Sequence, residues 1–292
     1  MTDTPDLLHR FWGIQPDDVK LLGGGMNSET WVVEHRGSTY VAKRVAATEV
    51  DELVAGCEVA SALSDAGFVT GRPFPTIDGR LVLTEHSLAL LEHVPGRELD
   101  DDTAEEQCWI ATTLAGVHAA GNPASGPSSA TFAADWLTPH LAGVAAHPWL
   151  APAIEAVRAE TDPLTVTWAV LHTDPSPEAF IHNDSTGVTG LIDWAGAKRG
   201  PVLYDVASAV MYLGGPAGAS VFLSTYRALG PLGNDEMQLL DAFRRFRWVV
   251  QAAYFAWRLS VRDLTGIAND AGNEKGLNDA RRGLAGLGLA TA

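Results

Sequence analysis

The chain has 292 residues, of which 46% are hydrophobic and nine are tryptophan, which favours a packed globular protein with one large core or two lobes. Its formal charge of −16 argues against a nucleic-acid partner, since phosphate backbones need basic surfaces. The negative charge either keeps the protein soluble or attracts a cationic substrate. The two cysteines are too few for a disulfide framework. The N-terminus is acidic, and no apolar run approaches the roughly 20 residues that a membrane span needs, so we expect a cytoplasmic protein without a membrane partner.

The N-terminal third of the chain predicts an antiparallel sheet. Short β-branched and aromatic runs at 19–22, 31–34 and 39–42 indicate three strands, and Gly37 suits the positive φ of a hairpin turn between the last two. A helix is expected from about Glu49 to Asp65, where apolar residues recur at spacings of three and four. Two more strands, at 81–83 and 89–91, precede a linker at 94–97.

Beyond this linker the pattern becomes helical. Thr103 and Glu106 form a capping box for a helix that ends near Ala120, and the next residues, 121–129, predict a surface loop. Further helices are expected at about 151–160, 236–263 and 277–284. We therefore expect an α+β fold with a β-rich N-terminal lobe over residues 1–94 and a mostly helical C-terminal lobe over residues 95–292.

A glycine cluster lies between the first two predicted strands. Gly24 and Gly25 would let backbone N–H groups approach a phosphate, and Asn27 and Ser28 add polar side chains, although a plain tight turn is the alternative. Lys43 lies on the third strand, where kinase-like folds hold the lysine that binds the α- and β-phosphates.

A phosphate-binding lysine needs a carboxylate partner from the next helix. Glu58 is the best candidate for the partner of Lys43, and Glu52 is the second. The alternative interpretation of Lys43 is a solvated strand residue.

Two aspartates each follow a short apolar run, Asp174 after 170–173 and Asp193 after 189–192. A hairpin-like turn at 183–187 lies between them, so we expect the two carboxylates to be close in space. Phosphoryl transfer needs one group to accept the hydroxyl proton and another to hold Mg²⁺ against the phosphates. Two carboxylates on neighbouring loops supply both, whereas either aspartate alone would more simply cap a turn.

Together these segments resemble the aminoglycoside phosphotransferase and choline kinase family, which shares a protein-kinase-like fold. The family pattern His-Gly-Asp-x-His-Pro-x-Asn has its counterpart here at His172, Asp174 and Pro177. The pattern Ile-Asp-Trp corresponds to Ile192, Asp193 and Trp194. The pattern Gly-Asp-Pro-x-Tyr-Asp-Leu-Ala corresponds to Gly200, Pro201, Tyr204, Asp205 and Ala207. The resemblance covers most of the chain, from about Leu21 to the C-terminal helices.

The resemblance implies an ATP-dependent kinase with a bilobal fold and an alcohol as acceptor. Asp174 would be the catalytic base on a loop braced by His172, and Asp193 would chelate Mg²⁺. Asp205 would be structural and order the loop after Asp193. The backbone around Glu92 to Val94 would bind the adenine edge of ATP.

The chain departs from the family pattern at three positions. The second metal ligand, an asparagine, is replaced by Ala179, while Thr173 and Ser176 replace a glycine and a histidine. Glu178 would then serve as substitute metal ligand. The alternatives are an enzyme with a single metal on Asp193, and a pseudokinase that binds nucleotide and acts as a partner protein.

Three classes of acceptor are compatible with the sequence: a cationic aminoglycoside or amino alcohol, a Ser or Thr of a peptide natural product that also needs a partner lyase, and a small metabolite such as homoserine. Arginines on the last long helix would suit a carboxylate-bearing acceptor. The alternative for its Arg and Trp residues is inward packing with snorkelling cations. The candidate lining residues are Asp205, Tyr212, Arg244, Arg247, Trp248, Tyr254, Trp257 and Arg258.

Overall fold

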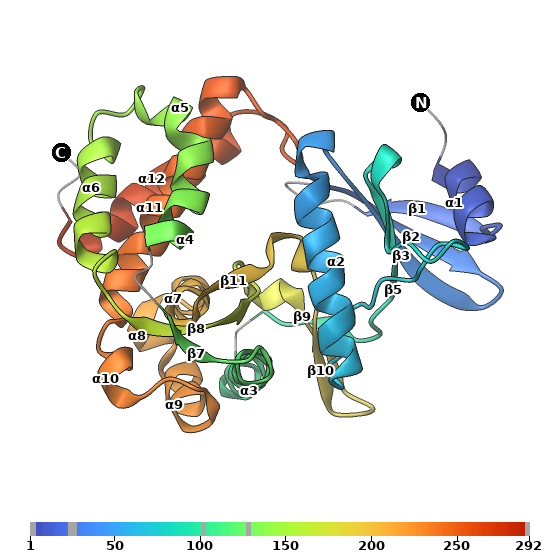
Figure 1. The fold of residues 1–292 in the computed structure, drawn as a ribbon, viewed down its shortest axis with the longest axis horizontal. Helices are drawn as coiled ribbons and strands as arrows, with labels where there is room; N and C mark the ends of the chain where they lie inside the picture. The colour runs from blue at the N-terminus through green and yellow to red at the C-terminus, as the bar shows by residue number, and fades with distance from the viewer. Residues whose placement is uncertain (1–3, 23–27, 101–102, 127–129, 290–292) are drawn as a thin grey trace. The chain divides into compact units, whose positions relative to one another are not determined.

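The computed structural model describes residues 4–22, 28–100, 103–126 and 130–289, and the chain forms two compact units (Figure 1). The first unit comprises Met1–Asp100 and Glu178–Lys198, and the second comprises Asp101–Pro177 and Arg199–Ala292. An antiparallel sheet in the first unit and mainly helices in the second confirm the expected α+β class. The assignment of separate roles to residues 1–94, as the nucleotide-binding lobe, and 95–292, as the lobe with the acceptor site, stays a prediction. The compact units are bounded differently, because a later segment returns to pair with the first unit.

The first unit is built on a five-stranded antiparallel sheet. Its strands are β1 (Asp18–Leu22), β2 (Ser28–His35), β3 (Ser38–Val45), β4 (Val82–Leu83) and β5 (Leu88–Glu92), in the spatial order β1-β2-β3-β5-β4. The predicted hairpin is confirmed, because β2 pairs with β3 through a turn in which Arg36 and Gly37 have φ values of 50° and 79°.

Each face of this sheet packs against a helix. Leu8 and Trp12 of α1 (Thr4–Trp12) join Val33 and Leu90 in one buried cluster. Residues of α2 (Val50–Asp65) pack with Val45 and Ala89 on the other face. Helix α1 was not predicted from the sequence, because nine residues are too few to be stable alone and its position depends on this packing.

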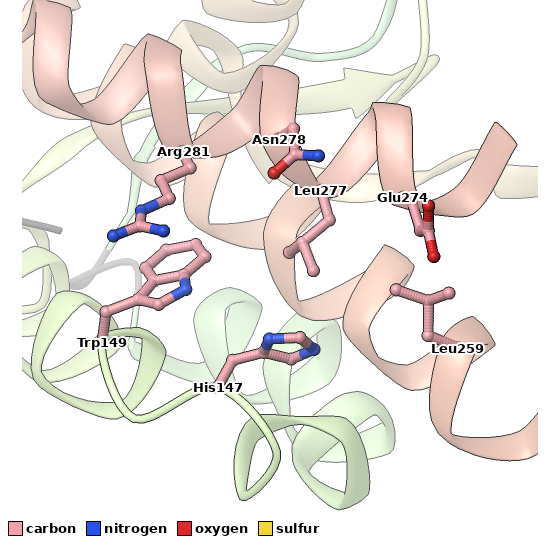
Figure 2. A pocket seen from close by; sticks show the side chains of 7 residues that line it. All are labelled: His147, Trp149, Leu259, Glu274, Leu277, Asn278 and Arg281. Atoms are coloured by element: carbon pink, nitrogen blue, oxygen red, sulfur yellow. The ribbon is translucent and has the colours of Figure 1, made fainter. Parts of the chain in front are cut away.

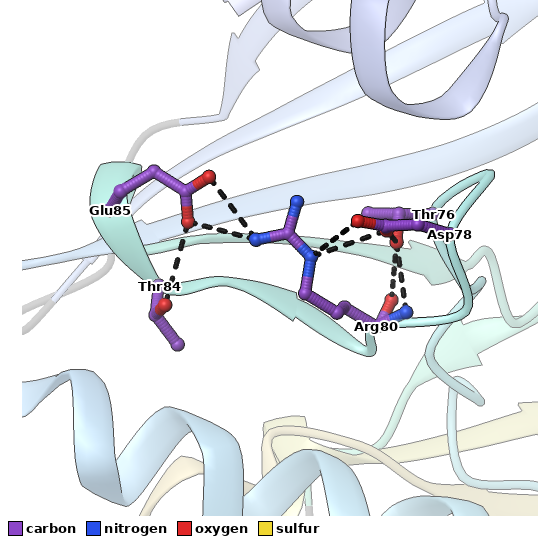
Figure 3. A network of polar contacts seen from close by, with 5 residues as sticks. All are labelled: Thr76, Asp78, Arg80, Thr84 and Glu85. Atoms are coloured by element: carbon purple, nitrogen blue, oxygen red, sulfur yellow. Dashed lines mark hydrogen bonds and ion pairs between the residues drawn. The ribbon is translucent and has the colours of Figure 1, made fainter.

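The segment that leads into β4 is held by a polar network around Arg80 (Figure 3). The Arg80 Nε donates to Asp78 Oδ2 at 3.0 Å, and its Nη1 donates to Glu85 Oε2 at 3.0 Å. The Thr76 hydroxyl and Arg80 lower the pKa of the Asp78 carboxyl below its usual range. Since these groups are exposed, the network orders the turn rather than supplying much stability.

The later segment of the first unit forms a second, three-stranded sheet. Strands β6 (Arg97–Glu98), β9 (Phe180–Asn183) and β10 (Val188–Leu191) lie in the order β10-β9-β6, with antiparallel pairs. The expected turn at 183–187 is confirmed, and Gly187 adopts a φ of 70° there. Residues 178–198 belong to the first unit because β9 pairs with β6, the Leu191 N–H donates to the Val69 carbonyl at 2.9 Å, and the turn at Trp194 packs against Gly56 of α2.

The second unit contains a three-stranded sheet of order β11-β8-β7 and ten helices in its described part. The strands are β7 (Ala124–Gly126), β8 (Val166–Leu171) and β11 (Lys198–Pro201). The helices are α3 (Ala104–Ala120), α4 (Ala130–Leu137), α5 (Leu141–Val144), α6 (Leu150–Thr161), α7 (Val202–Tyr212), α8 (Gly215–Gly218), α9 (Ser220–Leu229), α10 (Asn234–Met237), α11 (Leu240–Val261) and α12 (Ala271–Gly286). In the part of the chain that the structure describes, no helix combines the length and apolar character needed to cross a bilayer.

Helix ends in the second unit agree with the sequence in some places and differ in others. The Thr103 hydroxyl accepts a hydrogen bond from the Glu106 N–H at 3.2 Å, as expected at the start of α3. The helix expected over 236–263 is interrupted between α10 and α11. Helix α12 begins at Ala271, earlier than expected. Its glycines lower the helix propensity of the segment, but they allow it to pack closely on α11, since a Cβ at Gly276 would lie 2.3 Å from the Phe255 ring.

Gly56→Ala is expected to destabilise the first unit, although alanine is the better helix former. An added Cβ would lie 2.2 Å from the Trp194 carbonyl oxygen and 2.9 Å from the Ala195 Cα, and backbone cannot yield as a side chain does. Such overpacking costs about 1–3 kcal/mol, so thermal unfolding should show a lower Tm.

Gly286→Ala is the matched control, because Gly286 also lies in a helix and a Cβ there meets no described atom within 4 Å. A Tm for Gly56→Ala equal to that of the control would show that α2 does not pack closely against residues 194–195.

Candidate functional site

Lys43 and Asp193 form an ion pair within the first unit. Lys43 is buried on β3, opposite Thr30 of β2 and Ala89 of β5. Asp193 follows β10, has φ 67° and ψ 60°, and exposes 59% of its side chain. A left-handed conformation is uncommon for a residue other than glycine and is found disproportionately at functional sites.

Glu58, the expected partner of Lys43, lies elsewhere. It is exposed on α2, whose buried positions include Leu53, Cys57 and Ala60. Glu52 is exposed on the same helix. The structure therefore pairs Lys43 with Asp193 and does not make the expected pair with Glu58, because the helix turns its apolar residues toward the sheet and this glutamate toward solvent.

The expected nucleotide-binding segments are described in part. Gly24, Gly25 and Asn27 lie outside the described residues, while Ser28 begins β2 with its Oγ 3.3 Å from the Thr30 hydroxyl. In the expected hinge, the Glu92 N–H donates to the Arg72 carbonyl at 2.8 Å. The Val94 N–H, two residues after the end of β5, has no partner among the described residues.

The segment before Asp193 is tied to the position where the family pattern has a metal-binding asparagine. Ala179 is buried, and its carbonyl accepts a hydrogen bond from the Ile192 N–H at 2.9 Å. Glu178 is exposed in the 3-10 turn Pro177–Ala179. Across the described ranges, no three His, Cys, Asp or Glu side chains are grouped to bind a metal ion, so the role of Glu178 stays a prediction.

Asp174 lies in the second unit, in the middle of the loop that follows β8. Its carboxylate is 62% exposed, and Oδ1 accepts hydrogen bonds from the Tyr212 hydroxyl at 2.5 Å and from Arg247 Nη2 at 2.9 Å. Because Asp174 and Asp193 belong to different compact units, their joint action stays a prediction.

Arg247 is buried on α11 and anchored by a second contact, since its Nε donates to the Ser208 hydroxyl at 3.0 Å. Burial alone lowers the pKa of an arginine, but the neighbouring Tyr204, Tyr212 and Asp174 raise the pKa of Arg247 above its usual value. The guanidinium is therefore charged beside the Asp174 carboxylate.

Asp205 holds the loop that carries Asp174. Its buried carboxylate accepts hydrogen bonds from the backbone N–H of His172 at 2.7 Å and of Thr173 at 2.8 Å. The His118 Nε2 lies 3.1 Å from Asp205 Oδ2. The expectation that Asp205 orders the loop after Asp193 is wrong, because its carboxylate binds the backbone before Asp174.

His172 and Thr173 are both buried, which agrees with a braced loop. Thr173 has a φ of 78° and occupies the position of the glycine in the family pattern. A β-branched residue is strained in this left-handed region, so the two hydrogen bonds to Asp205 stabilise a conformation that threonine alone disfavours.

A cavity of about 460 Å³ adjoins Tyr212, whose hydroxyl binds Asp174. It is lined by Met211, Tyr212, Trp248, Gln251, Lys275, Asp279 and Arg282. Tyr212 and Trp248 were expected to line the acceptor site, and both do line this cavity.

The other expected lining residues have structural contacts. Arg258 is fully buried and donates to the carbonyls of Asp263 and Thr265, while Arg244 pairs with Asp241 at 2.7 Å. Tyr254 and Trp257 pack against His140, with ring centroids 5.6 and 5.4 Å apart. For Tyr254 and Trp257 the alternative interpretation, inward packing on the last long helix, agrees with the contacts, whereas its expectation of outward-snorkelling arginines is wrong for Arg258, which is fully buried.

A second cavity of about 270 Å³ lies beside another face of α12 (Figure 2). It is lined by His147, Trp149, Leu259, Glu274, Leu277, Asn278 and Arg281. The Arg281 guanidinium lies 5.8 Å from the centroid of a Trp149 ring, and burial lowers the pKa of His147. None of its lining residues is a predicted site residue, so the cavity beside Tyr212 is the better candidate for the acceptor.

Residues 18–243 match the family described as the phosphotransferase enzyme family, and the chain belongs to this family. It is therefore a phosphotransferase with an alcohol group as acceptor. A comparison with curated protein sequences finds no match.

Several solved structures resemble the chain. An amicoumacin kinase in complex with AMP-PNP, Ca²⁺ and Ami shares 14% identity, with a TM-score of 0.73 over 95% of this chain and 90% of that one. A choline kinase from Streptococcus pneumoniae shares 17% identity, with a TM-score of 0.71 over 92% and 93% of the two chains. A microcompartment-associated aminopropanol kinase shares 16% identity, with a TM-score of 0.69 over 99% and 98%. Because the sequence identities are only 14–17%, the structural similarity speaks for the fold alone, and it confirms the expected bilobal, protein-kinase-like fold.

Asp205→Ala is expected to lower the free energy of unfolding by about 3 kcal/mol, because it leaves the N–H groups of His172 and Thr173 buried without an acceptor. Urea denaturation measures the loss, and Asp205→Asn, which keeps the volume, should give a smaller one. Asp235→Ala is the control, since Asp235 is exposed on α10 and a change there should stay within about 0.5 kcal/mol. Equal losses for Asp205→Ala and the control would contradict the assigned role of Asp205.

Proposed function

We propose that the chain is an ATP-dependent kinase that phosphorylates a hydroxyl of a small molecule, with Asp174 as the base. The observation that carries this proposal is the exposed carboxylate of Asp174, which is held by Tyr212, a residue that also lines a cavity of about 460 Å³. Such a base aligns the hydroxyl and accepts its proton as the bond to phosphorus forms.

The nucleotide is held by the first unit in this proposal. Lys43 would bind the α- and β-phosphates, and the glycine cluster, with Gly24, Gly25, Asn27 and Ser28, is the segment proposed to contact them through backbone N–H groups. The Val94 N–H, which has no partner among the described residues, and the Glu92 carbonyl at the end of β5 are the groups proposed to bind the edge of adenine. The AMP-PNP in the amicoumacin kinase structure supports a nucleotide as donor.

The donor set of the first unit fits a hard divalent cation. Mg²⁺ is commonly bound by one or two carboxylates together with waters and substrate phosphates, and the exposed Asp193 carboxylate supplies one such ligand. Glu178 is the proposed second ligand, in place of the asparagine that Ala179 replaces. A cation held by these residues would supply positive charge to the transferred phosphoryl group.

The cavity disfavours a polycationic acceptor despite the net charge of the chain. Its lining holds two cations, Lys275 and Arg282, and one carboxylate, Asp279, which pairs with both of them. Trp248 and Gln251 add an aromatic face and an amide. We therefore favour a compact, uncharged or weakly charged alcohol over a large aminoglycoside.

The two other candidate functions have less support. The resemblance to an amicoumacin, a choline and an aminopropanol kinase supports a small-molecule acceptor rather than a peptide acceptor with a partner lyase. A pseudokinase would not need a base, yet Asp174 is positioned by Tyr212 and Arg247.

Asp174→Asn is expected to lower acceptor-dependent ADP release by about 100-fold or more, because the amide cannot accept the hydroxyl proton. The assay uses Mg²⁺, ATP and pools of small alcohols, amino alcohols and hydroxy acids, and calorimetry should show ATP affinity close to that of the wild type. Asp51→Asn is the control, since Asp51 is exposed on α2. Unchanged turnover in Asp174→Asn would remove the base assignment.

Lys43→Met should weaken Mg·ATP binding and turnover by about 10-fold or more, because it removes the charge that faces the phosphates while keeping the length of the side chain. Calorimetry with ATP measures the affinity. Lys20→Met, at an exposed position of β1, is the matched control. Equal affinity in both variants would place the nucleotide elsewhere.

A further inference from the structure

We propose that Arg247 and Tyr212 are positioning residues that fix Oδ1 of Asp174, so that Oδ2 is the atom that takes the proton of the acceptor. This inference rests on the proposed function, and it assigns roles to two side chains that the family pattern does not include. Both residues lie in the second unit with Asp174.

The contacts on the Asp174 carboxylate are one-sided. Oδ1 accepts from Tyr212 at 2.5 Å and from Arg247 Nη2 at 2.9 Å, and Arg247 Nη2 also lies 3.2 Å from the Tyr212 hydroxyl. Oδ2 has no hydrogen-bond partner among the residues that the structure describes. The three side chains thus form a closed triangle at one oxygen, which leaves the other available to a ligand.

The triangle is rigid on the arginine side and exposed on the carboxylate side. The Arg247 side chain is only 9% exposed, and its Nε is bound to Ser208 of α7, so the guanidinium is fixed before Asp174 contacts it. The Asp174 side chain is 62% exposed, and without the hydrogen bonds to Oδ1 it could adopt several rotamers. Holding one oxygen in place reduces this freedom, and alignment of the nucleophile is, with electrostatic stabilisation, what phosphoryl transfer requires of the protein.

The proton balance follows from this arrangement. The acceptor oxygen forms its bond to the γ-phosphorus as the bond from that phosphorus to the β-phosphate oxygen breaks. The hydroxyl proton passes to Asp174 Oδ2 and then to solvent, and ADP leaves with the bridging oxygen. Arg247 stays protonated throughout, so it orients the base without exchanging a proton.

The test is a double-mutant cycle between Arg247→Met and Asp174→Asn, scored on kcat. Arg247→Met and Tyr212→Phe should each lower kcat by about 10- to 100-fold, the range expected for loss of a hydrogen bond to a charged group. The KM for ATP should stay near that of the wild type. In the Asp174→Asn background, Arg247→Met should have little further effect, because its action passes through the carboxylate.

Two further measurements separate positioning from folding. Arg245→Met is the matched control, since Arg245 is another ion-paired arginine on α11, bound to Glu160, and its replacement should leave kcat unchanged. Added guanidinium should partly restore the kcat of Arg247→Ala and leave the kcat of Arg245→Ala unchanged.

Additive losses in the cycle, or no rescue together with a kcat loss equal to that of Arg245→Met, would overturn the positioning role. If the wild type releases no ADP with any acceptor pool, the proposed function fails instead. If Asp174→Asn is inactive but Arg247→Met keeps full turnover, only this inference fails.

Discussion

The second unit depends on one buried carboxylate that organises backbone far from it in sequence. Asp205, early in α7, accepts hydrogen bonds from two consecutive N–H groups, those of His172 and Thr173, and it also contacts His118 of α3. A buried charge is stable only when its hydrogen bonds are made. The loop before Asp174 therefore has little freedom to relax while α7 and α3 remain packed, and the position of the candidate base follows from that packing.

The first unit uses a different device for its functional carboxylate. Asp193 is bound by a buried lysine from the sheet, and the turn after it packs against α2 at Gly56, where no side chain fits. Trp194 anchors the same turn by donating its indole N–H to the Leu191 carbonyl at 2.8 Å. Each aspartate is thus placed by tertiary contacts of its own unit, and the carboxylates remain exposed while their surroundings are buried.

The sequence predicted what local pattern determines and missed what distant contacts determine. Short β-branched and aromatic runs and Gly37 identified the strands at 19–45, and the Thr103 cap identified the start of α3, because these signals lie within a few residues. The Lys43–Asp193 pair joins residues 150 apart in sequence, so nearness in the chain favoured Glu58 instead. The role of Asp205 was misplaced for the same reason, and the contact of Arg247 with Asp174 has no local signature.

Both loops that carry a candidate functional aspartate contain a residue with left-handed backbone. Asp193 itself has a positive φ, and at the other loop the strained residue is Thr173, directly before Asp174. Glycine would adopt this conformation without strain, whereas a β-branched side chain disfavours it by about 1–2 kcal/mol. The loop keeps its shape because Asp205 binds the N–H of Thr173 and that of the preceding residue, and such charge-assisted hydrogen bonds offset a strain of that size. A threonine is tolerated there because the buried aspartate, rather than the residue type, determines the backbone.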